Sequence, residues 1–209
     1  RTSSSTSPPN SNWLTTTLST MQTENNIMYT EDETSPWYAL RLFSLKQQAI
    51  NDELKRKGFT TFIPMETVDV IDRDNKLHHE LRPVVHNLIF VRKAMEESEF
   101  QKMLIAMPYK LSVIKKGRDS KEMAEIPAKE MHEFQLMCNP KLAEKKYIAE
   151  ESAKLKTGTT VLVTHGPLKG LTGKLIRINK KYYLLKDVPG IAVMLKVTRW
   201  CCQPLNNKT

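Results

Sequence analysis

From Lys156 onward the chain contains only short runs of strand-forming residues, and this pattern restricts the fold of its last quarter more than any other feature. The runs TTVLVTH, LTGKLIRIN, KYYLLKDV and IAVMLKVT follow one another within about fifty residues, separated by Gly, Pro and Asn. Consecutive short strands joined by tight turns are typical of small closed barrels. We therefore predict a small all-β barrel over residues 156–205.

The preceding segment, residues 36–138, alternates between strand and helix patterns instead. Strand patterns occur in WYALRLF, FTTFIPMETVDVID, LHHELRPVVHNLIFVRK and KLSVIKKG, and helical patterns cover residues 44–58, 96–107 and 127–139. The resulting order β-α-β-β-α-β-α predicts an α+β domain, an antiparallel sheet with helices packed on it.

The first of these helices has a recognisable start and stop. We expect Ser44 to cap it and Gly58 to end it, with an apolar stripe between them. The stripe consists of Leu45, Ala49, Ile50 and Leu54.

The rest of the chain connects or precedes these two domains. Residues 1–35 are polar, rich in Ser and Thr and aperiodic, which predicts a disordered tail. Residues 139–155 have no strand pattern and mixed charges, which predicts a linker that is partly helical at most.

Composition limits the compartment and excludes several classes of protein. The chain has no run of the roughly 18 apolar residues that a membrane span needs, and no secretory signal. Its three cysteines, Cys138, Cys201 and Cys202, are too few and too poorly spaced for a disulfide framework or a zinc site. We expect a cytoplasmic protein that does not bind membranes.

The net charge of +9 is concentrated in the predicted barrel. Residues 156–209 contain ten Lys and Arg but a single acid, Asp187. Such a patch is the electrostatic signature of RNA, DNA or an acidic protein partner. The alternative is a small barrel whose lysines keep its surface in contact with water and bind no partner.

No catalytic constellation occurs in the sequence. A nucleophile elbow, a His-Glu-x-x-His motif, a P-loop and a dinucleotide fingerprint are all missing. His78 and His79 are adjacent and would point to opposite faces of a strand, which is poor geometry for one metal ion. We therefore expect no enzyme, no catalytic residue, no cofactor and no metal.

The glycine-rich stretch GPLKGLTGK, residues 166–174, has two possible explanations. A phosphate cradle requires a helix after the glycine loop, whereas LIRINKKYYLLK has strand composition. Glycines are also needed where barrel strands bend or where backbones approach closely. The strand that follows favours the second explanation.

Four motifs together resemble the NusG family of transcription factors. GPLKGLTGKLIRI resembles the KOW motif of small SH3-like barrels, through Gly166, Pro167, Lys169, Gly170 and Gly173. WYALR (37–41), NLIFVR (87–92) and IPAKEMHEF (126–134) occur in the same order as in the NusG N-terminal (NGN) domain. The resemblance covers about residues 36–204.

The resemblance implies binding to RNA polymerase, at the clamp helices of its largest subunit, in support of processive transcription. The residues that match the family's contact patch are Trp37, Arg41, Val85, Leu88 and Phe90. Strand alternation places Leu88 and Phe90 on one face and Ile89 and Val91 on the other. Aromatic strand residues such as Trp37 and Phe90 can equally be core residues.

The patch also resembles a specialised branch of the family. Housekeeping members carry Phe-Pro-Gly-Tyr where this chain has VVHNL, and Asn87 is nearer to the Pro-Asn-Tyr of the RfaH branch. The His-Thr-Thr element of that branch is replaced by Phe100, Gln101 and Lys102. Asn87 and Leu88, a long acidic-then-basic linker and a divergent second helix together look most like the UpxY group, which implies antitermination of a capsular or surface polysaccharide operon.

The resemblance implies a recruiting role for the barrel, with nascent RNA, a ribosomal protein or Rho as partner. We expect a basic surface formed by Lys169, Lys174, Arg177, Lys180 and Lys181. Tyr182 and Tyr183 could stack on bases, although one of two adjacent strand residues points into the core. A housekeeping factor and a KOW-type RNA-binding or ribosome-associated protein are the alternatives, and we expect a monomer.

Overall fold

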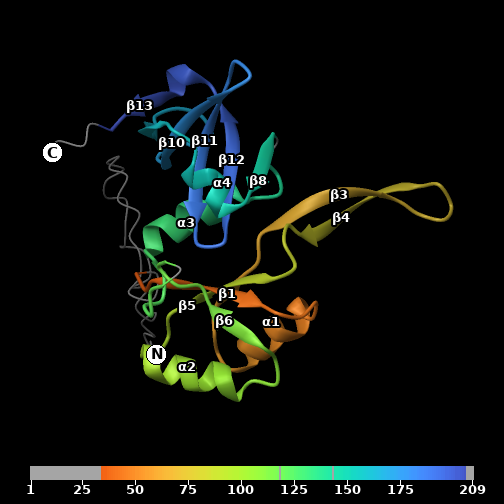
Figure 1. Cartoon of the computed structure of the whole chain (residues 1–209). Coiled ribbons are helices and arrows are strands. Elements are labelled where there is room, and N and C mark those ends of the chain that lie inside the picture. Colours follow the sequence, from red (N-terminus) through yellow and green to blue (C-terminus); the bar gives the residue numbers. More distant parts are fainter. Residues whose placement is uncertain (1–33, 118, 143, 206–209) are drawn as a thin grey trace, which may run out of the picture.

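The computed structural model describes residues 34–117, 119–142 and 144–205. The predicted disordered tail lies almost entirely outside these residues. Two domains are stacked one above the other, and a two-stranded hairpin projects from the side of the lower domain (Figure 1). Within the described residues, no helix is both long enough and apolar enough to span a membrane.

The N-terminal domain (residues 36–138) is built on an antiparallel sheet with helices on both faces, as the α+β prediction requires. Its strands are β1 (Trp37–Leu42), β2 (Thr61–Phe62), β5 (Leu88–Arg92), β6 (Leu111–Val113) and β7 (Glu125–Ile126). They follow the order β2-β5-β1-β6, and β7 also pairs with β1. Its helices are α1 (Gln47–Arg56), α2 (Glu97–Ala106) and α3 (Ala128–Met137).

The alternation of side chains along β5 is confirmed. Ile89 and Val91 belong to the core cluster that contains the buried residues of α1 and α2. Leu88 and Phe90 lie on the other face, in the cluster that contains Phe134 of α3. The sheet therefore has two apolar faces, and both are covered.

The start predicted for α1 is wrong by three residues. The helix begins at Gln47, and Ser44 makes no capping hydrogen bond. The buried stripe comprises Gln47, Ile50, Asn51 and Leu54. Leu45 precedes the helix and is 91% exposed, because the spacing around Ile50 and Leu54 leaves no place for it on the buried side.

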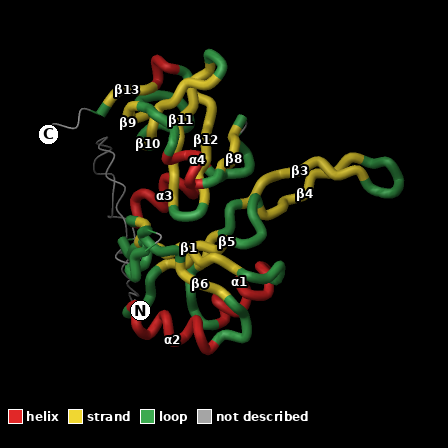
Figure 2. Tube along the Cα trace, viewed as in Figure 1, coloured by secondary structure: helices red, strands yellow, loops and turns green. Residues whose placement is uncertain are grey.

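Each of the two long strands predicted between residues 59 and 93 is broken into two. β3 (Met65–Ile71) and β4 (Leu77–Pro83) pair only with each other and form the projecting hairpin, while β2 and β5 belong to the main sheet (Figure 2). The first break falls at Ile63 and Pro64, and proline cannot donate a ladder hydrogen bond. The second falls at residues 84–87.

The C-terminal domain (residues 144–205) consists mostly of strands, which is compatible with a small all-β KOW domain. The predicted strands are β9 (Thr159–Val163), β10 (Thr172–Ile178), β11 (Lys181–Val188) and β12 (Ile191–Val197), and β13 (Cys202–Pro204) follows a 3-10 turn, η2 (Arg199–Cys201). Together with β8 (Lys145–Ile148) they follow the order β13-β9-β10-β11-β12-β8.

The absence of strand structure predicted for residues 139–155 is wrong. β8 pairs with β12 from Lys145↔Leu195 to Ile148↔Ala192. The short helix α4 (Glu150–Lys154) follows, and its Ala153 is fully buried beside Ile176 and Leu185. The polar composition hid this strand, because β8 lies at the end of the sheet and keeps no side chain fully buried.

The glycines of residues 166–174 shape the sheet, as predicted. Gly166 and Gly170 have φ values of 85° and 92°, and β10 follows them directly. Gly173 is required for a different reason. A Cβ added there would lie 2.8 Å from the Leu185 carbonyl oxygen and 2.9 Å from Leu184 Cδ1.

We predict that Gly173→Ala lowers the free energy of unfolding by about 1–3 kcal/mol, because the methyl group is forced against backbone in a packed sheet. Gly117→Ala is the matched control, since a Cβ there meets nothing within 4 Å. Urea denaturation of both variants measures the difference. Equal stability of the two would contradict the close approach at Gly173.

Candidate functional site

The C-terminal domain packs directly on the N-terminal domain, over the face of β5 that carries Leu88 and Phe90. Helix α3 lies between the two sheets and packs against β11 and β12 (Figure 1). Buried residues from both domains form one continuous apolar cluster, with Trp37, Leu88 and Phe90 on one side and Val188 and Ile191 on the other. The two domains therefore share a core.

Leu88 is covered by the turn between β11 and β12. A Cβ added at Gly190, in this turn, would lie 3.0 Å from Leu88 Cδ1 and 2.9 Å from Ile114 Cδ1. Gly190 has a φ of 96°, and Leu88 is only 3% exposed. The turn fits onto the sheet because residue 190 has no side chain.

Phe90 packs against aromatic rings of its own domain, and Trp37 belongs to the cluster that both domains share. The ring centroids of Phe90 and Phe134 lie 5.6 Å apart, and Phe62 lies 6.2 Å from Phe90 on another side. Phe90 is fully buried and Trp37 is 8% exposed. In this closed arrangement of the domains, both aromatic residues are therefore core residues, which is one of the two possibilities that the sequence left open.

Of the other two matched residues, Arg41 is exposed on β1 and Val85 is half-buried at the edge of the shared core. The buried side chain of Gln47 fixes the segment from Val85 to Leu88. Its Nε2 donates to the carbonyl oxygens of Val85 (2.9 Å) and Leu88 (2.7 Å). Sequence reasoning missed Gln47, although a polar residue in the buried stripe of a helix is a signal for such a contact.

A buried ion pair joins the two domains. Glu133 of α3 lies 2.7 Å from Lys186 Nζ of β11, with the two side chains 4% and 11% exposed. The Thr172 hydroxyl, on β10, donates to the same carboxylate. A second carboxylate, Glu150, accepts the amide N–H of Gly190 at 2.6 Å. The Glu133 contacts fix the position of the C-terminal domain on α3, whereas the Glu150 contact joins α4 to the β11–β12 turn within the C-terminal domain.

The five predicted basic residues do not form one surface. Arg177, Lys180 and Lys181 lie together at the exposed β10–β11 turn. Lys169 lies at the other end of β10, in the loop that contains Gly166. Lys174 is half-buried and donates to the Lys156 carbonyl oxygen.

The two adjacent tyrosines point to opposite faces of the sheet, as strand alternation predicts. Tyr183 is buried on the face that α4 covers, with Lys146 Nζ 5.9 Å from its ring centroid. Tyr182 is half-buried on the other face, and the Arg177 guanidinium lies 5.6 Å from its ring. Only Tyr182 remains beside the exposed basic turn.

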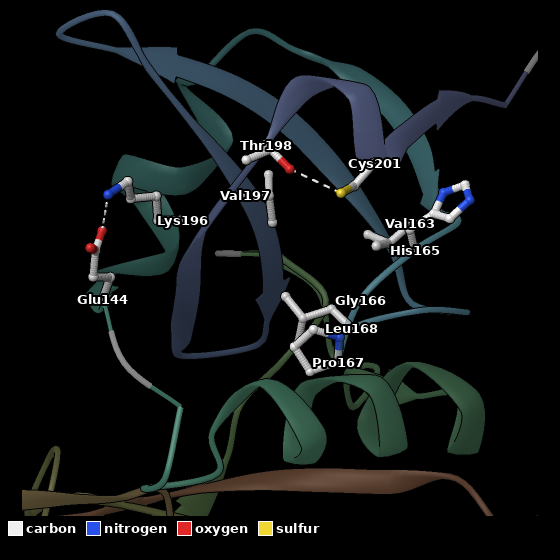
Figure 3. A pocket seen from close by; sticks show the side chains of 10 residues that line it. All are labelled: Glu144, Val163, His165, Gly166, Pro167, Leu168, Lys196, Val197, Thr198 and Cys201. Atoms are coloured by element: carbon white, nitrogen blue, oxygen red, sulfur yellow. Dashed lines mark hydrogen bonds and ion pairs between the residues drawn. The ribbon is translucent and has the colours of Figure 1, made fainter.

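The C-terminal domain also carries a pocket of about 390 Å³, which sequence reasoning missed. One wall is formed by the loop after β9 and the other by the end of β12 and η2 (Figure 3). The lining residues are mostly apolar, with one ion pair between Lys196 and Glu144 at 2.5 Å. They are Glu144, Val163, His165, Gly166, Pro167, Leu168, Lys196, Val197, Thr198 and Cys201.

Three groups of the N-terminal domain have shifted pKa values because they are buried or paired. Burial raises the pKa of Tyr38 to about 12, and its hydroxyl donates to Glu125. The hydrogen bond from Lys93 lowers the pKa of the Glu125 carboxyl. Burial also raises the pKa of the Cys138 thiol to about 12. These groups stabilise structure, and none of them lines the pocket.

The described residues contain no group of three or more His, Cys, Asp or Glu that could hold a metal ion. His79 Nδ1 lies 2.7 Å from Asp69 Oδ1 across the exposed β3–β4 hairpin. The neighbouring His78 pairs with Val70 in the same ladder and is exposed on the other face of the hairpin.

The chain is thus a two-domain protein in which a mostly-β domain covers an apolar sheet face of an α+β domain. The family described as "Transcription termination factor nusG" matches residues 35–135, which are nearly the whole N-terminal domain. The N-terminal domain therefore belongs to the NusG family. A search of curated protein sequences found no match to the chain.

We predict that Lys186→Met opens the interface between the domains, because it leaves the Glu133 carboxylate buried without its cation. Loss of one partner of a buried pair destabilises the closed form by about 3–5 kcal/mol. In a chain carrying Leu88→Cys, thiol labelling at residue 88 should accelerate at least ten-fold. Peptide mass spectrometry distinguishes this thiol from Cys138, whose raised pKa keeps it unreactive.

Lys116→Met is the matched control, because Lys116 and Glu122 form an exposed pair, and exposed pairs contribute about 0–1 kcal/mol. Its labelling rate should equal that of the parent. Equal rates in the Lys186→Met and Lys116→Met variants would show that the buried pair does not hold the domains together.

Proposed function

We propose that the protein is a transcription elongation and antitermination factor that binds RNA polymerase through the β1–β5 face of its N-terminal domain. The family match to residues 35–135 supports the class. The contact residues proposed are Trp37, Arg41, Val85, Leu88 and Phe90, and the proposed partner surface is the clamp helices of the largest subunit. The role is one of binding, without chemistry.

The observation that carries this proposal is the apolar face of β5 and the way it is covered. Leu88 lies under a turn that belongs to a different domain, rather than under a helix of its own domain. An apolar surface covered by a separable domain can be exposed without unfolding either sheet. Such a surface suits a partner that competes with the covering domain.

Polymerase binding through Leu88 therefore requires the C-terminal domain to move away. The interdomain contact keeps most molecules closed. The apparent affinity for polymerase is therefore the affinity of the open form multiplied by the fraction of molecules that are open. Polymerase and the C-terminal domain would then compete for the same surface. In this proposal the bound factor favours the processive conformation of polymerase.

A narrower role, action on a capsular or surface polysaccharide operon, is also part of the proposal. It is supported by Asn87 and Leu88 at the start of β5 and by the replacement of the family's aromatic motif. The genes beside the coding sequence test it. A position at the head of a glycosyltransferase operon supports this role, whereas a position elsewhere favours a housekeeping factor.

The alternative function is RNA binding or ribosome association through the C-terminal domain, with nascent RNA, a ribosomal protein or Rho as the partner. The exposed cluster of Arg177, Lys180 and Lys181 supports it. Polymerase binding by the N-terminal domain separates the two functions, because a ribosome-associated module needs no such contact.

We predict that Lys186→Met raises the affinity for core RNA polymerase by about ten-fold or more, because it weakens the competing interdomain contact. Adding Leu88→Asp to this variant should abolish the gain and lower the affinity below that of the wild type. Fluorescence anisotropy with labelled factor and purified polymerase measures both changes.

The double variant is informative because its C-terminal domain is already displaced, so that the Leu88→Asp substitution acts on polymerase binding alone. Circular dichroism confirms that both sheets stay folded. If the folded double variant binds polymerase as tightly as Lys186→Met does, Leu88 lies outside the contact surface.

A further inference from the structure

We infer that the pocket of the C-terminal domain and the aromatic pair beside it form a binding site for an unpaired base of single-stranded nucleic acid. The inference rests on the alternative function, nucleic-acid binding by this domain. It places the base-binding site at the pocket rather than at the β10–β11 turn. It does not depend on polymerase binding. Four features of the site carry it.

The first feature is an exposed aromatic pair at the rim of the pocket. Trp200, in η2, is 72% exposed, and its ring centroid lies 5.5 Å from that of His165. His165 lines the pocket and is itself exposed. Exposed aromatic rings are the platforms on which single-stranded nucleic acids stack their bases.

The second feature is the shape and chemistry of the pocket. Its volume of about 390 Å³ lies within the range of small-molecule sites, and a base with its sugar belongs to that size class. Val163, Pro167, Leu168 and Val197 supply apolar walls (Figure 3). The polar residues of the lining include Thr198, whose hydroxyl lies 2.9 Å from Cys201 Sγ, and Lys196, which pairs with Glu144.

The third feature is the charge around the rim. Lys169 follows Leu168 in one wall, and Arg199 lies between Thr198 and Trp200 in the other. Both side chains are exposed. Lys169 and Arg199, whose guanidinium lies 3.4 Å from the Cys202 carbonyl oxygen, add positive charge to both walls, which suits the phosphates that flank a stacked base.

The fourth feature is the scarcity of opposing charge. The only carboxylate in the pocket lining belongs to Glu144, and Lys196 neutralises it. From Lys156 to Leu205 the one acid is Asp187, which pairs with Ala192 in the β11–β12 ladder, away from the pocket lining. The charge favours a polyanion, and the aromatic pair favours one with unstacked bases.

The occupant is therefore a single strand, because the bases of a duplex are stacked on each other and cannot enter the pocket. RNA and DNA share the base and phosphate chemistry that the site recognises. Parallel titrations with single-stranded RNA and DNA of one sequence distinguish these two sources.

The test is anisotropy with fluorescein-labelled twelve-nucleotide mixed-sequence RNA and DNA, single-stranded and duplex, and the full chain in the absence of polymerase. Trp200→Ala should weaken single-strand binding by about five- to 150-fold, the range that corresponds to loss of one stacked base. Lys169→Ala should lower the salt dependence of binding by about 0.7 in the log–log slope.

Phe43→Ala is the matched control, because Phe43 is 55% exposed and has Lys110 Nζ 5.4 Å from its ring, but lies in the N-terminal domain. Its affinity should equal that of the wild type. A triple variant, Arg177→Ala with Lys180→Ala and Lys181→Ala, measures the contribution of the β10–β11 turn separately.

Three outcomes overturn the inference: wild-type affinity in the Trp200→Ala variant, equal binding of duplex and single strand, or no single-strand binding at low salt. Wild-type RNA affinity in Trp200→Ala would favour a protein as the occupant of the pocket. Because polymerase is not in the assay, none of these outcomes bears on the polymerase contact.

Discussion

The apolar outer face of β5 is the constraint on which the arrangement of both domains depends. Phe90 and Leu88 alternate onto that face and cannot stay in water without a large free-energy cost, roughly 1.5–3 kcal/mol for each side chain. The N-terminal domain covers Phe90 with Phe134 of α3, but its own helices leave Leu88 to the β11–β12 turn. The C-terminal domain therefore completes the core of the N-terminal domain.

The polar contacts in this interface give it a specific geometry rather than great strength. The Glu133 carboxylate is largely desolvated. The Lys186 ammonium pairs with it, and the Thr172 hydroxyl donates a hydrogen bond to it. Burying such a pair roughly cancels its Coulombic gain against the cost of desolvation, whereas separating the partners inside the interface is costly. When the whole domain leaves, however, both groups regain water together. An interface of this composition is well defined when closed, and opening it does not require unfolding.

Much of the fold could be predicted from the sequence because local patterns determine it. The alternation of Leu88 and Phe90 with Ile89 and Val91, and the turns at Gly166 and Gly170, follow from neighbouring residues alone. β8 and the docking of the domains could not be predicted in this way. Lys145 to Ile148 become a strand because β12 offers a free edge, and Leu88 is covered by a turn about one hundred positions later in the chain. The pocket was missed for the same reason, since its walls come from three separate segments.

The two surfaces of the C-terminal domain can act independently because they lie on different parts of one sheet. The surface that covers Leu88 is the β11–β12 turn, whereas the pocket is formed by the loop after β9, the end of β12 and η2. All ten residues that line the pocket, from Glu144 to Cys201, belong to the C-terminal domain. The pocket therefore moves with this domain whether or not it covers β5. A strand held at Trp200 does not occupy the turn that covers Leu88, so a factor whose C-terminal domain has moved away could contact polymerase and nucleic acid at once.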